Sequence, residues 1–274
     1  MPLIPEPLQY RLIQLRRVLH EYPELSGQEA NTAAVICKFL DGLAIKYRAH
    51  VAEGAVNASS DNFTIEIIGQ GAHGARPHES IDAVVVGSLM IMALQTIVSR
   101  DVDPARPSVV SVGQFHAGTA PNVIAGQARL EGTVRAQDPA VRQQLLTSVR
   151  RIAELIAQLH GAKIQVTVNE GPPPLIDIRE MADLAHCAAV AAVGEANVLP
   201  LKTANMRAED FSYYMERIPG AYVRFGSQVP GKEGFPAHSS KFDFPEEALA
   251  VGAAYYHAIA KIAGQRLSEQ MLRS

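Results

Sequence analysis

Apolar and polar positions follow a regular order through the middle of the chain. Four segments have the alternation or the β-branched content of strands, namely 63–68, 108–115, 128–135 and 164–168. Between them, 81–99 is strongly apolar and 139–160 has apolar residues at helical spacing. The predicted order is β-α-β-β-α-β, which is the ferredoxin-like unit. We therefore expect a small α/β domain over residues 57–170.

The segments on either side predict a second, discontinuous domain. Leucines at helical spacing predict a first helix that ends near Pro23, and the Ser26 to Glu29 capping box starts another helix, which contains Cys37. After the prolines at 172–174, the pattern predicts a helix over 181–193, a short strand over 221–226 and a closing helix over 246–264. The expected fold class is α/β, with residues 1–56 and 171–274 packed together and 57–170 inserted between them.

Composition excludes several classes of protein. In 274 residues, 25 basic and 28 acidic side chains give a net charge of −3, which does not favour nucleic acid as a partner. Two cysteines provide no disulfide framework, and the N-terminus has no signal-like apolar region. The longest uncharged run, 83–99, is slightly short of the roughly 18 residues of a membrane span, so it predicts a buried helix. We expect a soluble, cytoplasmic protein with no membrane partner.

One motif has a misleading form. Residues 69–74 read GQGAHG and follow a predicted strand, as a dinucleotide-binding fingerprint does. In that fingerprint a helix opens at the third glycine, but here Pro77 follows, and Leu94 stands where an acidic residue would hold the ribose. Nicotinamide binding is therefore rejected. Among nine histidines, His73, His78 and His238 stand out because they lie in loop-like segments.

Six segments, taken together, resemble one enzyme family. They are RRVLHEYPELS at 16–26, GQGAHGARPH at 69–78, APNVI at 120–124, GTVR at 132–135, AEDFS at 208–212 and PAHS at 236–239. They occur in the order found in the M20 metallopeptidases, specifically the amidohydrolases similar to aminoacylase and hippurate hydrolase. The resemblance implies a catalytic α/β domain with an inserted lid domain that forms a homodimer, matching the insertion expected at 57–170.

The resemblance also implies roles for five residues. His73 corresponds to a catalytic lid histidine that reaches the partner subunit's active site and stabilises an oxyanion. Asn122 and Arg135 correspond to residues that hold the polar end and the carboxylate of the substrate. His238 corresponds to a metal ligand, and Glu209, in the EDF motif near the catalytic site, is a second candidate catalytic residue. From the residues alone, without the motifs around them, the favoured interpretation of Arg135 is a surface ion-pair partner and that of Glu209 an acid at a helix start.

The chain departs from the family between the second helix and the lid. Family members carry there a His-Ala-Cys-Gly-His-Asp-like motif, a Glu-Glu pair and a Gly-x-His segment, which hold two divalent ions, zinc or manganese. In this chain, Val56 runs directly into Asn57 and the lead-in to the lid. A catalytic zinc takes about three protein ligands, and His238 alone cannot supply them.

Three hypotheses follow. The first is a metal-dependent amidohydrolase that cleaves the amide bond of N-acyl amino acids, with activity impaired or absent in the chain as written. The alternative is a catalytically inactive remnant that acts as a dimerising or ligand-binding protein. The third, a dinucleotide-binding protein, is disfavoured by the arguments above.

Overall fold

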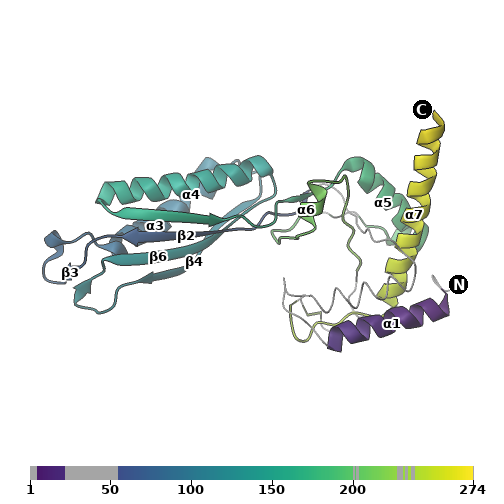
Figure 1. Cartoon of the computed structure of the whole chain (residues 1–274), viewed down its shortest axis with the longest axis horizontal. Helices are drawn as coiled ribbons and strands as arrows, with labels where there is room; N and C mark the ends of the chain where they lie inside the picture. Colours follow the sequence, from purple (N-terminus) through teal and green to yellow (C-terminus); the bar gives the residue numbers. More distant parts are fainter. Residues whose placement is uncertain are drawn as a thin grey trace. The chain divides into compact units, whose positions relative to one another are not determined.

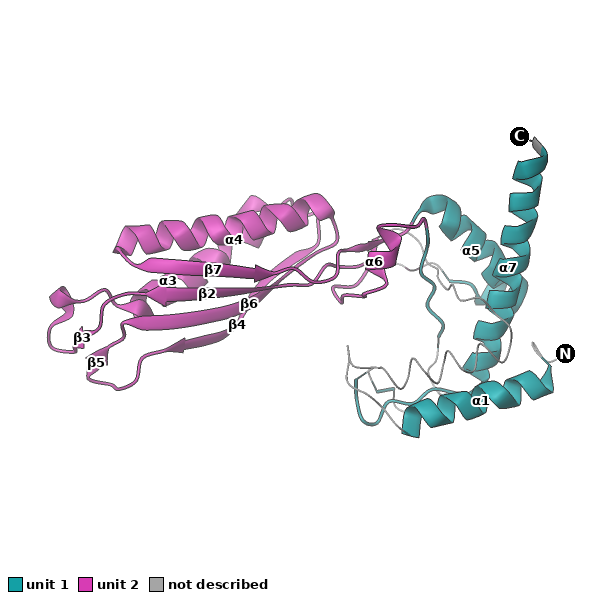
Figure 2. Cartoon of the chain, viewed as in Figure 1, with its two compact units in different colours: residues 1–53, 178–200, 220–274 teal, residues 54–177, 201–219 magenta. Residues whose placement is uncertain are grey.

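A computed structural model describes residues 5–21, 55–199, 201, 204–226, 231, 234–235 and 238–273. The chain forms two compact units, shown in different colours in Figure 2. One unit comprises 54–177 and 201–219, and the other comprises 1–53, 178–200 and 220–274. The segment 201–219 thus packs with residues of the predicted insertion, although the sequence places it with the second domain. The domain boundaries themselves stay a prediction.

The first unit contains a four-stranded antiparallel sheet with two helices. The strands lie in the order β4-β6-β2-β7. The main elements, visible in Figure 1, are β2 (Asp61–Ile68), α3 (Ala83–Leu94), β4 (Ser108–Ala117), β6 (Gln127–Ala136), α4 (Pro139–His160) and β7 (Lys163–Asn169). Shorter elements are β1 (Ala55–Asn57), β3 (Ala72–His73), η1 (Pro77–Glu79), η2 (Ile97–Asp101), β5 (Val123–Ile124), β8 (Leu175–Ile176) and α6 (Ser212–Met215).

Strict alternation along β2 and β6 gives this sheet one apolar and one polar face. On β2, Phe63, Ile65 and Ile67 are buried, and they pack in one cluster with apolar residues of α3 and α4. On the opposite face, Arg129 forms ion pairs with Glu66 and Glu131. Since side chains alternate along a strand, Arg135 lies on the same open face as Arg129.

The predicted helix over 139–160 is confirmed at both ends. The Asp138 side chain accepts hydrogen bonds from the backbone N–H groups of Ala140 and Val141, and Pro139 occupies the first turn. The helix ends at Gly161, which has a φ of 70° in the left-handed region. These local signals explain why the sequence predicts this helix well.

The prediction for 81–99 needs two corrections. The α-helix ends at Leu94 and is followed by a π-helical turn over Ile97–Asp101. The helix is also only half-buried, because a helix lying on one side of a sheet buries one face. Within the part of the chain that the structure describes, Ala83–Asp101 is the one helical stretch long and apolar enough to cross a membrane by those criteria alone.

The second unit is mainly helical where the structure describes it. Its helices are α1 (Glu6–Glu21), α5 (Arg179–Val193), the short η3 (Glu195–Asn197) and α7 (Glu247–Arg273). Alanines of α5 pack against Tyr255 of α7, whose pKa is raised by burial. The predicted helix that starts at Ser26, with Cys37, lies outside the described residues.

Two predictions for this unit are wrong in detail. Residues 221–226 do not form a strand, and the described residues of this unit contain no other strand to pair with them. The closing helix extends to Arg273, beyond the predicted end at 264. A continuous run of helix-forming residues without glycine or proline after Gly264 accounts for the extension.

Candidate functional site

His73 and Asn122 lie together at one end of the sheet. The short strands β3 and β5 pair, with His73 opposite Val123. The Gly74 N–H donates to the Asn122 carbonyl at 2.8 Å, and the turn from Ala120 to Val123 is closed by a bond of 3.2 Å. Both His73 and Asn122 are exposed, so their side chains can contact a molecule that approaches from outside.

The backbone fixes which nitrogen of His73 can donate. The Ala75 N–H donates to His73 Nδ1 at 3.1 Å. In a neutral imidazole one nitrogen accepts and the other carries the proton, so the hydrogen bond to Nδ1 favours the tautomer with its proton on Nε2. His73 therefore presents an N–H donor, the group that stabilises a developing negative charge on oxygen.

The glycines of GQGAHG allow close backbone contacts. A Cβ at Gly69 would lie 2.2 Å from the carbonyl oxygen of Ile81, and one at Gly74 would lie 3.0 Å from that of Asn122. These glycines therefore let β3 pack against the neighbouring segments and support the loop that holds His73.

Arg135 and the segment that carries Glu209 meet at the other end of the sheet. Arg135 Nη1 donates to the Met206 carbonyl at 3.0 Å. Glu209 is half-buried, and its backbone carbonyl accepts from Ser212 N at 3.2 Å, at the start of α6. This position agrees with the interpretation of Glu209 as an acid at a helix start. Glu209 also lies close in sequence to Met206, whose carbonyl Arg135 contacts.

The two pairs of residues cannot meet within one chain. His73 and Asn122 lie near the start of β6, and Arg135 lies near its end; the ten residues of β6, at about 3.3 Å each, span roughly 30 Å. In Figure 2, β3 and β5 lie at the end of the sheet opposite α6. A site that uses His73 and Asn122 together with Arg135 therefore needs residues from two copies of the chain.

His238 belongs to the other compact unit. Its φ is 74°, a left-handed conformation that histidine adopts more often than most residues, and its side chain is exposed. Among the residues that the structure describes, no three His, Cys, Asp or Glu side chains form a group that could hold a metal ion. The described donors therefore do not fit a two-metal centre.

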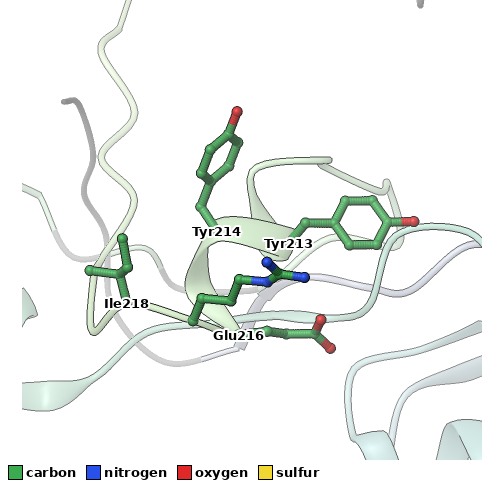
Figure 3. Close-up of a pocket in the computed structure, with 5 residues that line it drawn as sticks. Tyr213, Tyr214, Glu216 and Ile218 are labelled. Atoms are coloured by element: carbon green, nitrogen blue, oxygen red, sulfur yellow. The ribbon is translucent and has the colours of Figure 1, made fainter. Parts of the chain in front are cut away.

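A shallow pocket of about 380 Å³ lies at α6, lined by Tyr213, Tyr214, Glu216, Arg217 and Ile218. Figure 3 shows the two tyrosine rings pointing in different directions from the helix. The pocket includes none of the five predicted site residues. Its first lining residue, Tyr213, comes shortly after Glu209 in the sequence, but the pocket is too open to define a substrate site.

Sequence reasoning missed the partner of Arg135. Met206 offers only its backbone carbonyl, which carries no residue-specific signal, and it is 71 positions away. The nearby AEDFS motif drew attention to Glu209, but nothing in that motif indicates contact with the end of β6.

Comparison with known proteins identifies the family. The model of peptidase family M20/M25/M40 matches residues 18–262. The chain belongs to this family. Hippurate hydrolase from Campylobacter jejuni is 35% identical over 211 residues, which are 77% of this chain and 54% of that protein. N-acyl-L-amino acid amidohydrolase from Geobacillus stearothermophilus is 37% identical over 185 residues, 67% of this chain and 50% of that protein.

A solved structure supports the same assignment. The YXEP protein of Bacillus subtilis, described as a dinuclear metal-binding peptidase from the M20 family, aligns with a TM-score of 0.62 at 32% identity. The alignment covers 78% of this M20 chain and 52% of the YXEP chain. The chain thus spans about half the length of the relatives it matches.

Proposed function

We propose that this chain is derived from an M20 amidohydrolase that cleaves the amide bond of N-acyl amino acids, and that it retains the lid and substrate-binding groups. Residues 57–170 form the lid or dimerisation domain in this proposal, and 1–56 with 171–274 derive from the catalytic domain. The names of the relatives support the substrate class. The observation that carries the proposal is the exposed His73 side chain, which lies beside Asn122, accepts from the Ala75 N–H at Nδ1 and leaves Nε2 to donate.

In this proposal two copies complete one site. His73 and Asn122 of one copy contact the reacting carbonyl and the polar end of a substrate, while Arg135 of the other copy binds its carboxylate. The guanidinium offers parallel N–H donors that match a carboxylate. The homodimer is supported by the separation of the two groups along β6 and by the uncharged exposed face of α3.

We further propose that hydrolysis is impaired in the chain as written. The motifs that supply most metal ligands in the family are not in the sequence, and His238 remains as the one candidate carried over. In this proposal Glu209 lies near the catalytic site. Dimerisation or ligand binding without catalysis is the alternative function, favoured by the complete core of the lid.

The metal content tests this proposal. After incubation with zinc or manganese and gel filtration, we expect below about 0.1 ion per subunit, because stable sites need about three protein ligands. Mass spectrometry of metals, on protein whose intact mass is verified, provides the measurement. One or two tightly held ions per subunit would contradict the proposal that metal binding is impaired. Hydrolysis of an N-acyl amino acid, lost in His238→Ala, would then establish an active enzyme.

The carboxylate role of Arg135 has a separate test. Replacing Arg135 by alanine should weaken binding of hippurate at least about tenfold, because a charge-assisted paired contact is lost. Titration calorimetry measures the affinity, and Arg129→Ala, on the same strand and face, serves as the matched control. Equal affinities for Arg135→Ala and the unmodified chain would remove Arg135 from the binding site.

A further inference from the structure

The segment 204–211, which carries Glu209, is held within the sheet-containing unit by contacts on two sides. On one side its backbone bonds to β1 and the following residue: Asn205 N–H donates to the Val56 carbonyl at 3.1 Å, and Ala58 N–H donates to the Arg207 carbonyl at 3.0 Å. Met206 lies between these two bonded residues. Its carbonyl is bound on the other side, by the Arg135 side chain at the end of β6.

Two side chains contact this segment, one on β6 and one just after it, and their hydrogen bonds differ in strength. Arg135 Nη1 makes a charge-assisted hydrogen bond of 3.0 Å in a half-buried position. Gln137 Nε2 lies 3.5 Å from the Asn205 carbonyl, at the limit of a hydrogen bond, and 3.6 Å from Met206 Sδ, which is a weak acceptor. Hydrogen bonds from charged donors are stronger than neutral ones, so Arg135 provides the main side-chain tie.

We propose that Arg135 is a positioning residue, which fixes segment 204–211 and therefore Glu209 against the end of β6. The tie acts on the backbone, so it constrains the path of the chain toward α6 and not the Met206 side chain. Asn205 supports the same path, because its Oδ1 accepts from the Arg207 N–H at 2.7 Å. Loss of Arg135 leaves the segment bound on the β1 side and, at the end of β6, by the weaker contacts of Gln137.

The contact also affects the carboxylate role of Arg135, and this consequence rests on the proposed function. With Nη1 on the Met206 carbonyl, the guanidinium is held at one end, and the Nε and Nη2 groups form no hydrogen bond with the described residues. That edge can bind a carboxylate through two parallel bonds. A guanidinium held at one end loses less freedom on binding, so the segment and the ligand stabilise each other.

Hydrogen exchange of the full chain without ligand tests the tie. In Arg135→Met, the amides of Asn205 and Arg207 should exchange about tenfold faster, because local opening no longer breaks a charge-assisted bond. Arg135→Lys, which keeps one donor, should restore most of the protection. Arg129→Met removes an arginine from the same strand and face without contact to the segment, and should leave these amides unchanged.

The outcomes separate this inference from the proposed function. Unchanged exchange in Arg135→Met, or equal effects of Arg135→Met and Arg129→Met, would overturn the tie whether or not hippurate binds. Faster exchange in Arg135→Met, with protection restored in Arg135→Lys, supports the contact between Arg135 and the segment, even if calorimetry detects no binding of hippurate. If Arg135→Lys regains protection but not hippurate affinity, the positioning and the carboxylate roles are both present and distinct.

Discussion

Replacing Arg142 by methionine is expected to lower the free energy of unfolding of the sheet-containing unit by about 3 to 5 kcal/mol, because it leaves a buried carboxylate without its partner. Arg142 of α4 and Asp61 of β2 are 8% and 0% exposed. They form two parallel hydrogen bonds of 2.9 and 2.6 Å. Hydrogen bonding to Asp61 raises the pKa of Arg142, so the guanidinium stays charged over the whole working pH range.

The same pair binds the chain where it leaves the sheet. Arg142 Nη2 also donates to the Gly171 carbonyl at 3.1 Å, and the Gly171 N–H donates to Asp61 at 3.2 Å. The first residue of β2 and the segment after β7 are thereby joined to α4. The loss on removing Arg142 therefore includes these backbone contacts as well as the ion pair.

Urea denaturation followed by circular dichroism provides the measurement, with Arg151→Met as the matched control. Arg151 lies on the same helix and pairs with Asp101 at 2.6 Å, but its side chain is 51% exposed. Exposed pairs contribute about 0 to 1 kcal/mol, so the control should be nearly neutral. Equal losses in the two variants would contradict the buried pair as a main source of stability.

A double-mutant cycle isolates the pair itself. Asp61→Asn should be costly alone, because it leaves Arg142 charged and buried. Combining Asp61→Asn with Arg142→Met should cost less than the sum of the two single changes, since no unpaired buried charge then remains. Strict additivity would show that the two side chains do not stabilise each other.

The parts of the fold that the sequence predicts well are those with local signals. α4 begins after a capping aspartate and ends at a left-handed glycine, and both are visible in the sequence. The strands β2 and β6 alternate because one face is buried under the helices. In each case the residues that determine the element lie within it or next to it.

The features that the sequence did not predict depend on distant partners. Asp61 and Arg142 are 81 positions apart, so the turn-like composition around Asp61 gave no sign of a buried ion pair. Residues 221–226 have the composition of a strand, but a strand also needs a neighbour, and none lies in the described residues of that unit. The local sequence pattern therefore predicts neither the buried ion pair nor the absence of a strand at 221–226.

The candidate site shows the same division. The motifs gave His73, Asn122, Arg135, Glu209 and His238 as candidates, and the resemblance implied that His73 acts on the partner subunit, but neither showed which of these residues lie together within one chain. The structure brings His73 to Asn122 through β3 and β5, and it brings Arg135 to the segment before Glu209. Their placement at opposite ends of β6 follows from strand pairing, which a single sequence does not specify.

The second prediction with a large expected effect concerns the exposed face of α3. Val84, Val85, Leu89 and Met92 are 40%, 46%, 43% and 70% exposed. No charged residue interrupts the chain from Ala83 to Ser99. An exposed apolar helix face of this kind marks an interaction surface, and we propose that a second copy of the chain covers it.

Replacing Met92 by glutamate should weaken the dimer at least about 100-fold, because a two-fold interface places the same charge on both copies and desolvates it. The fold should tolerate the change, since Met92 is 70% exposed in the single chain. Sedimentation equilibrium over a range of protein concentrations measures the dissociation constant.

The control for this change is Leu159→Glu. Leu159 is 75% exposed on α4, whose outward face already carries charged residues, so the added carboxylate should leave the dimer intact. Dissociation in Leu159→Glu but not in Met92→Glu would move the interface to α4. A monomeric unmodified chain would contradict the dimer itself and, because His73 and Arg135 lie at opposite ends of β6, would leave each copy with only half of the proposed substrate-binding groups.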